Sequence, residues 1–189
     1  MDGYAFVYVF PSLWEDHCKI GFSRDPLSRV SALHRRWFEF FDLDAGMLVE
    51  TETVRDARQL ELELRRPLAD HNAPPPMTVR REAAGHTEWF RGAGPALALR
   101  GRMLEQRGHR VHAPVRPWLR AALSRRGDQL YAWAEAQLEA VESGRCADPV
   151  QVERTLRDAL DAYTALEMDP APLLPPEAWH WYRRMQAIG

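Results

Sequence analysis

Two short apolar runs near the start of the chain constrain its fold more than any other feature. The first, at residues 5–10, is rich in β-branched and aromatic side chains and stops at Pro11. The second covers residues 18–22, beyond a polar turn at residues 14–16. Runs of this length and composition are typical of buried strands. Together they predict a β-hairpin at the start of an α+β domain.

Helical and strand patterns then alternate. Asp25 followed by Pro26 is a favourable helix start, because the carboxylate can cap the first turn and proline suits the first helical position. Residues 42–52 predict a third strand, and Thr53 is placed to cap a second helix. Later segments predict a loop at 72–86, a short apolar return to the core at 87–90 and a helix at 94–106. The order is that of a ββαβα module.

The pattern changes after residue 114. The rest of the chain lacks strand patterns and contains amphipathic stretches, at 119–125, 128–142, 149–166 and 177–188. We therefore expect two domains, at residues 1–114 and 115–189, the second a helical region of unknown role. Its aromatic segment at 179–182 leaves two uses open, packing on the first domain or a homodimer contact through the C-terminal helices.

Composition narrows the setting. The net charge of −2 argues against binding nucleic acid through bulk charge, although it allows a local basic groove. Cys18 and Cys146 have no metal-like spacing and favour reduced thiols in the cytoplasm. His109 and His112 lack an evident third ligand, so we assign them no metal. We expect neither a signal peptide nor a membrane span.

One lysine, Lys19, is present among 25 basic Lys and Arg side chains. It is followed by Ile20 and Gly21 within the second apolar run. Two explanations are open. A coding bias towards arginine would leave Lys19 as the one lysine present by chance. The functional explanation is that this position requires the compact ammonium of lysine instead of the planar guanidinium of arginine.

The motifs follow one another in a recognisable order. Residues 7–9 read Val-Tyr-Val, residues 19–21 read Lys-Ile-Gly, and helices with Arg29 and Glu61 precede Glu-Trp-Phe at 88–90. This order resembles the GIY-YIG nuclease superfamily, in particular the phage and bacterial branch with Lys-Ile-Gly as its second motif. The resemblance covers about residues 4–92. It implies a small three-stranded antiparallel sheet flanked by helices, and hydrolysis of DNA with one divalent metal.

The resemblance also implies site residues. Tyr8 corresponds to the tyrosine of the first motif, and Lys19 replaces the tyrosine of the second. Arg29 corresponds to the helix arginine, and Glu61 to the glutamate that binds Mg²⁺ or Mn²⁺. His34 lies one residue further from the arginine than the histidine of better-known members. Arg65 stands where relatives often carry a histidine.

Each residue type suits this chemistry. Tyr8 is a general base or orients the water; as a base it needs a nearby cation, since a free phenol titrates near pH 10, and Lys19 is the expected source. Lys19 would otherwise contact the phosphate. Arg29 offers a fork for phosphate oxygens, and Glu61 suffices as the protein ligand of a largely hydrated Mg²⁺. The simpler alternatives are a core tyrosine and solvated charged side chains.

A basic and aromatic cluster follows the first helix. His34, Arg35 and Arg36, with Trp37, would follow a DNA backbone or stack on a base. The alternative is a helix end that favours cations.

The sequence thus predicts a metal-dependent DNA endonuclease. The alternative is an inactive module with the same fold that binds nucleic acid or protein.

Overall fold

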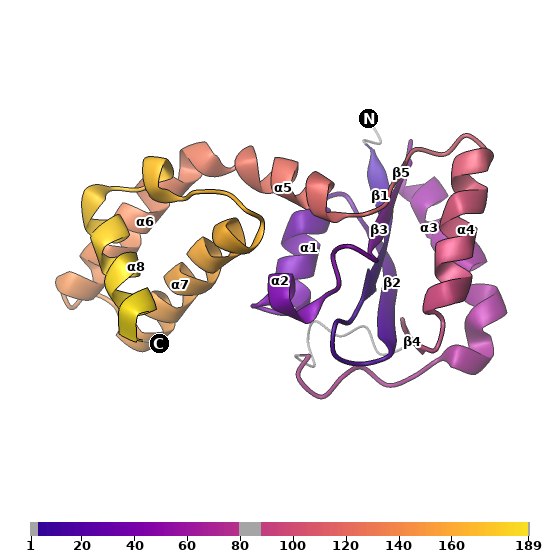
Figure 1. Ribbon diagram of the computed structural model, residues 1–189, viewed down its shortest axis with the longest axis horizontal. Coiled ribbons are helices and arrows are strands. Elements are labelled where there is room, and N and C mark those ends of the chain that lie inside the picture. Colours follow the sequence, from indigo (N-terminus) through magenta and orange to yellow (C-terminus); the bar gives the residue numbers. More distant parts are fainter. Residues whose placement is uncertain (1–3, 80–87, 189) are drawn as a thin grey trace. The chain divides into compact units, whose positions relative to one another are not determined.

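A computed structural model describes residues 4–79 and 88–188 of the chain. Its contacts divide the chain into two compact units, one ending at Leu119 and the other starting at Arg120. The first unit combines a sheet with helices, and the second is helical (Figure 1). The part of the chain that the structure describes has no helix with the length and apolar character needed to cross a bilayer.

The first unit is built on a five-stranded antiparallel sheet with the order β4-β2-β1-β3-β5. The strands are β1 (Ala5–Pro11), β2 (His17–Ser23), β3 (Met47–Thr51), β4 (Trp89–Arg91) and β5 (Val111–His112). The predicted α+β class is correct, but the expectation of three strands is wrong. The two additional strands lie at the edges and are only three and two residues long, too short to leave a strand pattern in the sequence.

The register of the hairpin decides which side chains share a face. Tyr8 pairs with Gly21, and Phe10 pairs with Lys19. Because side chains alternate along a strand, these four residues lie on one face, while Val7, Val9 and Ile20 lie on the other. In Figure 1, α1 and α2 lie on one side of the sheet, and α3 and α4 lie on the other.

Five helical segments accompany this sheet. They are α1 (Pro26–Leu33), α2 (Trp37–Phe40), α3 (Val54–Arg65), the 3-10 helix η1 (Arg66–His71) and α4 (Gly94–Gln106). Both predicted caps are present, since Asp25 accepts from the Ser28 amide and Thr53 accepts from the Asp56 amide. The predicted loop at 72–86 lies partly outside the described residues.

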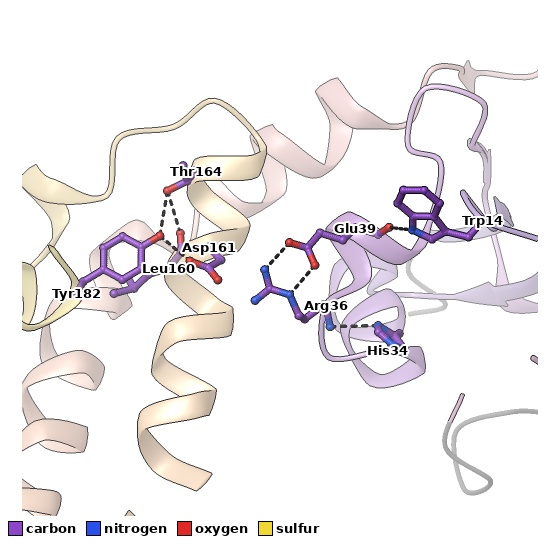
Figure 2. Close-up of polar contacts among 8 residues, drawn as sticks. All are labelled: Trp14, His34, Arg36, Glu39, Leu160, Asp161, Thr164 and Tyr182. Carbon is purple, nitrogen blue, oxygen red and sulfur yellow. Dashed lines mark hydrogen bonds and ion pairs between the residues drawn. The ribbon is translucent and has the colours of Figure 1, made fainter. Parts of the chain in front are cut away.

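The second unit has its own core. Its helices are α6 (Gly127–Glu142), α7 (Pro149–Ala165), the 3-10 helix η2 (Ala171–Leu173) and α8 (Pro176–Ile188). Trp181 and Tyr182 are buried in this core. The Tyr182 hydroxyl donates to Asp161 at 2.7 Å and thereby ties α8 to α7 (Figure 2). Trp179 also packs against this core, so three of the four residues at 179–182 contribute to the core of their own unit. A homodimer contact stays a prediction.

Helix α5 (Arg116–Ser124) contains the division between the units. Its first turn belongs to the first unit. Val115, just before the helix, and Leu119 are fully buried there, and the ring centroids of Trp118 and Phe6 lie 5.1 Å apart. The sequence pattern changes just after the last strand, β5, whereas the first unit continues as far as Leu119.

Candidate functional site

Tyr8 and Arg29 form the first element of the site. Tyr8 lies on the central strand β1 and is 1% exposed. Arg29 lies on α1, which the Asp25 cap fixes at its first turn, and its Nε donates to the Tyr8 hydroxyl at 3.1 Å. The phenol is therefore held by a guanidinium from the helix that covers its face of the sheet.

Gly21 makes room for that phenol. A Cβ atom at this position would lie 2.4 Å from the Tyr8 hydroxyl and 2.6 Å from Cζ. Both distances are far below van der Waals contact, so the ring can cross β2 only where the paired residue is a glycine. The Lys-Ile-Gly motif therefore has a steric reason at its third position.

Lys19 is fully buried at 0% exposure. Its ammonium donates to the Glu88 carboxylate at 2.5 Å and lies 5.6 Å from the centroid of the Trp89 ring. Burial lowers the pKa of Lys19, and the hydrogen bond and charge of Glu88 oppose this effect. The paired strands β2 and β4 bring Lys19 beside Trp89, and Glu88 immediately precedes that strand.

The cation that acts on Tyr8 is Arg29. Burial raises the pKa of Tyr8, the charge and hydrogen bond of Arg29 lower it, and the carboxylates of Glu88 and Glu61 raise it further. We expected Lys19 to supply the lowering field. The structure instead directs the Lys19 ammonium to Glu88, and the net shift of the Tyr8 pKa is upward.

Glu61 lies on α3 and is 4% exposed. Its Oε1 accepts from Arg65 at 2.8 Å, one helical turn further along. The described residues contain no group of three or more His, Cys, Asp or Glu side chains that could hold a metal. A magnesium ion requires only one or two carboxylates, since it keeps most of its water. The Glu61 carboxylate is thus a ligand of the right type, although it is almost fully buried and its Oε1 is already held by Arg65.

Electrostatic interactions link the predicted site residues in pairs: Tyr8 with Arg29, Tyr8 with Glu61, and Lys19 with Arg29. Arg29 and Glu61 both act on the pKa of Tyr8, and Arg29 and Arg65 both lower the pKa of Lys19. Glu88 acts on the pKa values of both Tyr8 and Lys19. We call this group the charge cluster; its members are Tyr8, Lys19, Arg29, Glu61, Arg65 and Glu88.

Sequence reasoning assigned no role to Glu88. It stands 69 positions from Lys19, so only the pairing of β2 with β4 brings the two together. Its position could have indicated a role, since it directly precedes Trp89 and Phe90 in the Glu-Trp-Phe motif that supported the family resemblance.

The predicted nucleic-acid-binding residues lie between α1 and α2. The His34 ring stacks on Phe40 with centroids 4.4 Å apart, and its Nδ1 accepts from the Arg36 amide at 3.2 Å. Arg36 forms an ion pair with Glu39 (Figure 2). Arg35 is exposed, whereas Trp37 is 3% exposed and belongs to the core. A role for Trp37 in stacking on a base is therefore excluded.

Cys18 is no nucleophile in this arrangement. Burial raises the pKa of its thiol to about 12, and its Sγ donates to the Phe90 carbonyl at 3.6 Å. The thiol stays protonated near neutral pH, which agrees with the buried position of Cys18 on β2, where it pairs with Phe90 of β4.

Residues 5–110 match the family model of the T5orf172 domain. The chain belongs to the T5orf172 domain family. This domain is associated with GIY-YIG and HNH-like endonuclease families of phages, and the match is to the T5orf172 domain itself, not to a GIY-YIG model. No curated protein and no solved structure matches the chain. All members of the charge cluster lie within the matched T5orf172 range.

Proposed function

We propose that this T5orf172 protein is a metal-dependent DNA endonuclease that hydrolyses phosphodiester bonds. The observation that carries the proposal is the bond from Arg29 to the Tyr8 hydroxyl at 3.1 Å, within electrostatic range of the Glu61 carboxylate. The phenol and the guanidinium are in contact, and the Glu61 carboxylate on α3 is near enough to raise the pKa of Tyr8. Family membership supports the same class of function.

Arg29 would have two tasks. A guanidinium has five N–H donors in a fixed fork, so it can bind non-bridging phosphate oxygens while its Nε holds the phenol. Because α1 is capped at Asp25 and packs on the sheet through Leu27 and Val30, the guanidinium is positioned before the substrate arrives.

Tyr8 would orient the attacking water. Its raised pKa keeps the phenol protonated near neutral pH, so a hydrogen bond to the water suits it better than removal of a proton. The Lys19 ammonium is directed to Glu88 and not to the Tyr8 hydroxyl. It would act through Glu88, a member of the charge cluster whose side chain is 29% exposed.

Glu61 would hold Mg²⁺ or Mn²⁺. When bound, the ion would act as a Lewis acid and align the phosphate. Arg65 already donates to one oxygen of this carboxylate, so the ion and the guanidinium would share Glu61. This sharing predicts modest metal affinity, which the replacement Arg65→Ala would raise.

A second function also has a specific observation in its favour. Glu61 and Lys19 are both engaged in ion pairs within the protein, as expected for a domain that keeps the fold and binds DNA without cutting it. The two functions differ in whether Glu61 is required for an activity or only for stability.

A cleavage assay separates them. The full chain is incubated with plasmid and single-stranded DNA in Mg²⁺ or Mn²⁺, with EDTA as the metal-free control. We expect cutting that EDTA abolishes and that Glu61→Gln reduces at least about a hundredfold, the scale for removing one charge-stabilising group from an active site. Glu63→Gln is the matched control, since Glu63 is exposed on the same helix. Absence of cutting with DNA still bound in a gel shift would identify the binding module instead.

A further inference from the structure

Trp14 is the most exposed tryptophan for which burial is described. It lies in the loop between β1 and β2, and 78% of its surface is accessible. An aromatic ring with this exposure is open to a ligand that can stack on it.

The indole is held in place although it is exposed. Its Nε1 donates to the Glu39 carbonyl at 3.1 Å (Figure 2). The amide of the preceding residue, Leu13, donates to the Phe40 carbonyl at 2.9 Å, and the Ser12 amide donates to the His17 carbonyl at 2.7 Å. These bonds fix the loop against α2, so a ligand would meet an aromatic face that is already ordered, and ordering would cost little on binding.

Contacts connect this indole to the basic segment after α1. Trp14 is bonded to Glu39, the Glu39 carboxylate pairs with Arg36, and the Arg36 amide donates to His34. Figure 2 shows the indole, the guanidinium and the imidazole on this one part of the first unit. The aromatic side chain beside the basic residues is thus Trp14, whereas Trp37, the residue indicated by the sequence, is buried.

We propose that Trp14 stacks on an unpaired base of the DNA strand that enters the site, with His34, Arg35 and Arg36 beside the adjoining phosphates. This inference rests on the proposed function and specifies the substrate: DNA with a single-stranded segment. Bases within a duplex stack on one another and offer no free face, whereas an unpaired base can stack on an aromatic ring whatever its identity.

The neighbouring charges favour a base over a phosphate at the indole. Glu15 and Asp16 follow Trp14 in the loop and are exposed, so a phosphate there would be repelled. The basic residues lie on the other side of Glu39. This arrangement places the sugar-phosphate backbone towards α2 and the base on the indole.

The loop is also within reach of the charge cluster. Phe10 pairs with Lys19, and the hairpin loop begins a few residues beyond that pair. Arg29 contacts Tyr8, six residues before Trp14, and at a rise of about 3.3 Å per residue this segment spans at most about 20 Å. A strand with a phosphate beside Arg29 would therefore bring a base a few nucleotides away to Trp14.

Binding of labelled oligonucleotides in EDTA, where no cutting occurs, tests this inference. Single-stranded and fully duplex oligonucleotides are compared, together with a single-stranded series in which an abasic residue is moved along the strand. The proteins are the full chain and the variants Trp14→Ala and Trp14→Phe. Leu13→Ala is the matched control, since Leu13 is an exposed apolar residue of the same loop.

We expect Trp14→Ala to weaken single-strand binding on the order of tenfold, as for loss of one base–aromatic stack, and Trp14→Phe and Leu13→Ala to bind nearly as wild type. An abasic residue at the position that faces Trp14 should weaken oligonucleotide binding by the wild type and leave binding by Trp14→Ala unchanged. Equal binding by Trp14→Ala and wild type, or a loss independent of the abasic position, would overturn the inference. Binding that depends on Trp14 without any cutting would support it and refute only the catalysis. A wild-type chain that binds no DNA would refute both.

Discussion

The single lysine has a structural reason. Lys19 is fully buried, with its ammonium on Glu88 and its position beside the Trp89 ring. A compact ammonium suits a site where one carboxylate and one aromatic face receive the charge, whereas a guanidinium presents a wide planar fork. Among the two explanations that the sequence left open, this environment favours the need for a point charge over coding bias.

Breaking this ion pair should destabilise the first unit. We expect Glu88→Gln to lower the free energy of unfolding by about 2 kcal/mol, because Lys19 then lacks its counter-charge in a buried site; the partial exposure of Glu88 keeps the loss below that of a fully buried pair. The double variant Lys19→Met with Glu88→Gln should recover part of this loss, since it leaves no unpaired charge. Urea unfolding of the single and double variants measures the coupling.

The control is an exposed ion pair. Glu139→Gln removes the carboxylate that pairs with Arg145 at the surface, and such pairs contribute at most about 1 kcal/mol. Equal, small effects of Glu88→Gln and Glu139→Gln would show that the Lys19 pair contributes nothing beyond a surface contact.

At the level of elements, local signals fixed the helix starts well. The Asp25-Pro26 pair predicted the start of α1, and in the structure the Asp25 carboxylate accepts from the Ser28 amide at 3.0 Å. This contact spans three residues, so the sequence contains all the information it requires. The start of α3 at Thr53 follows the same rule.

The cap of α1 gives a prediction for both stability and the site. Asp25→Ala should lower the free energy of unfolding by about 1 kcal/mol, whereas Asp25→Asn, which can still cap, should change it little. Because Arg29 lies one turn further along α1, fraying of the first turn should also reduce cleavage in the alanine variant more than in the asparagine variant. Thermal unfolding and the cleavage assay measure the two effects; identical behaviour of both variants would contradict a capping role.

The edge strands show where local signals end. β4 and β5 are held by pairing with β2 and β3, strands far away in the sequence. Two or three residues do not form a periodic pattern. Their place in the sheet is therefore a consequence of long-range packing, and it is β4 that delivers Glu88 to Lys19.

At the level of the whole molecule, the two units have separate cores. The core of the second unit is formed by side chains of α6, α7 and α8, with Leu130, Leu156 and Tyr182 among its members. We expect a fragment of residues 120–189 to fold alone, with a helical circular dichroism spectrum and a cooperative thermal transition. Its stability should stay below about 5 kcal/mol, since so short a chain builds only a small core. A fragment that melts without cooperativity would show that the second unit depends on the first.

The sequence by itself determined the hairpin, the capped helices and the division into an α+β part and a helical part, and it predicted Tyr8, Lys19, Arg29 and Glu61 as site residues. These features rest on neighbouring residues or on the order of short motifs. Only the tertiary structure decided that Glu88 receives Lys19, that Arg29 holds Tyr8, that Arg65 pairs with Glu61 and that Trp14 is exposed where Trp37 is buried. Most of these outcomes depend on which distant segments pack together; the turn between Glu61 and Arg65 is local, but burial of that pair is not. Pairing and burial across the fold are set by the whole core, which no local pattern specifies.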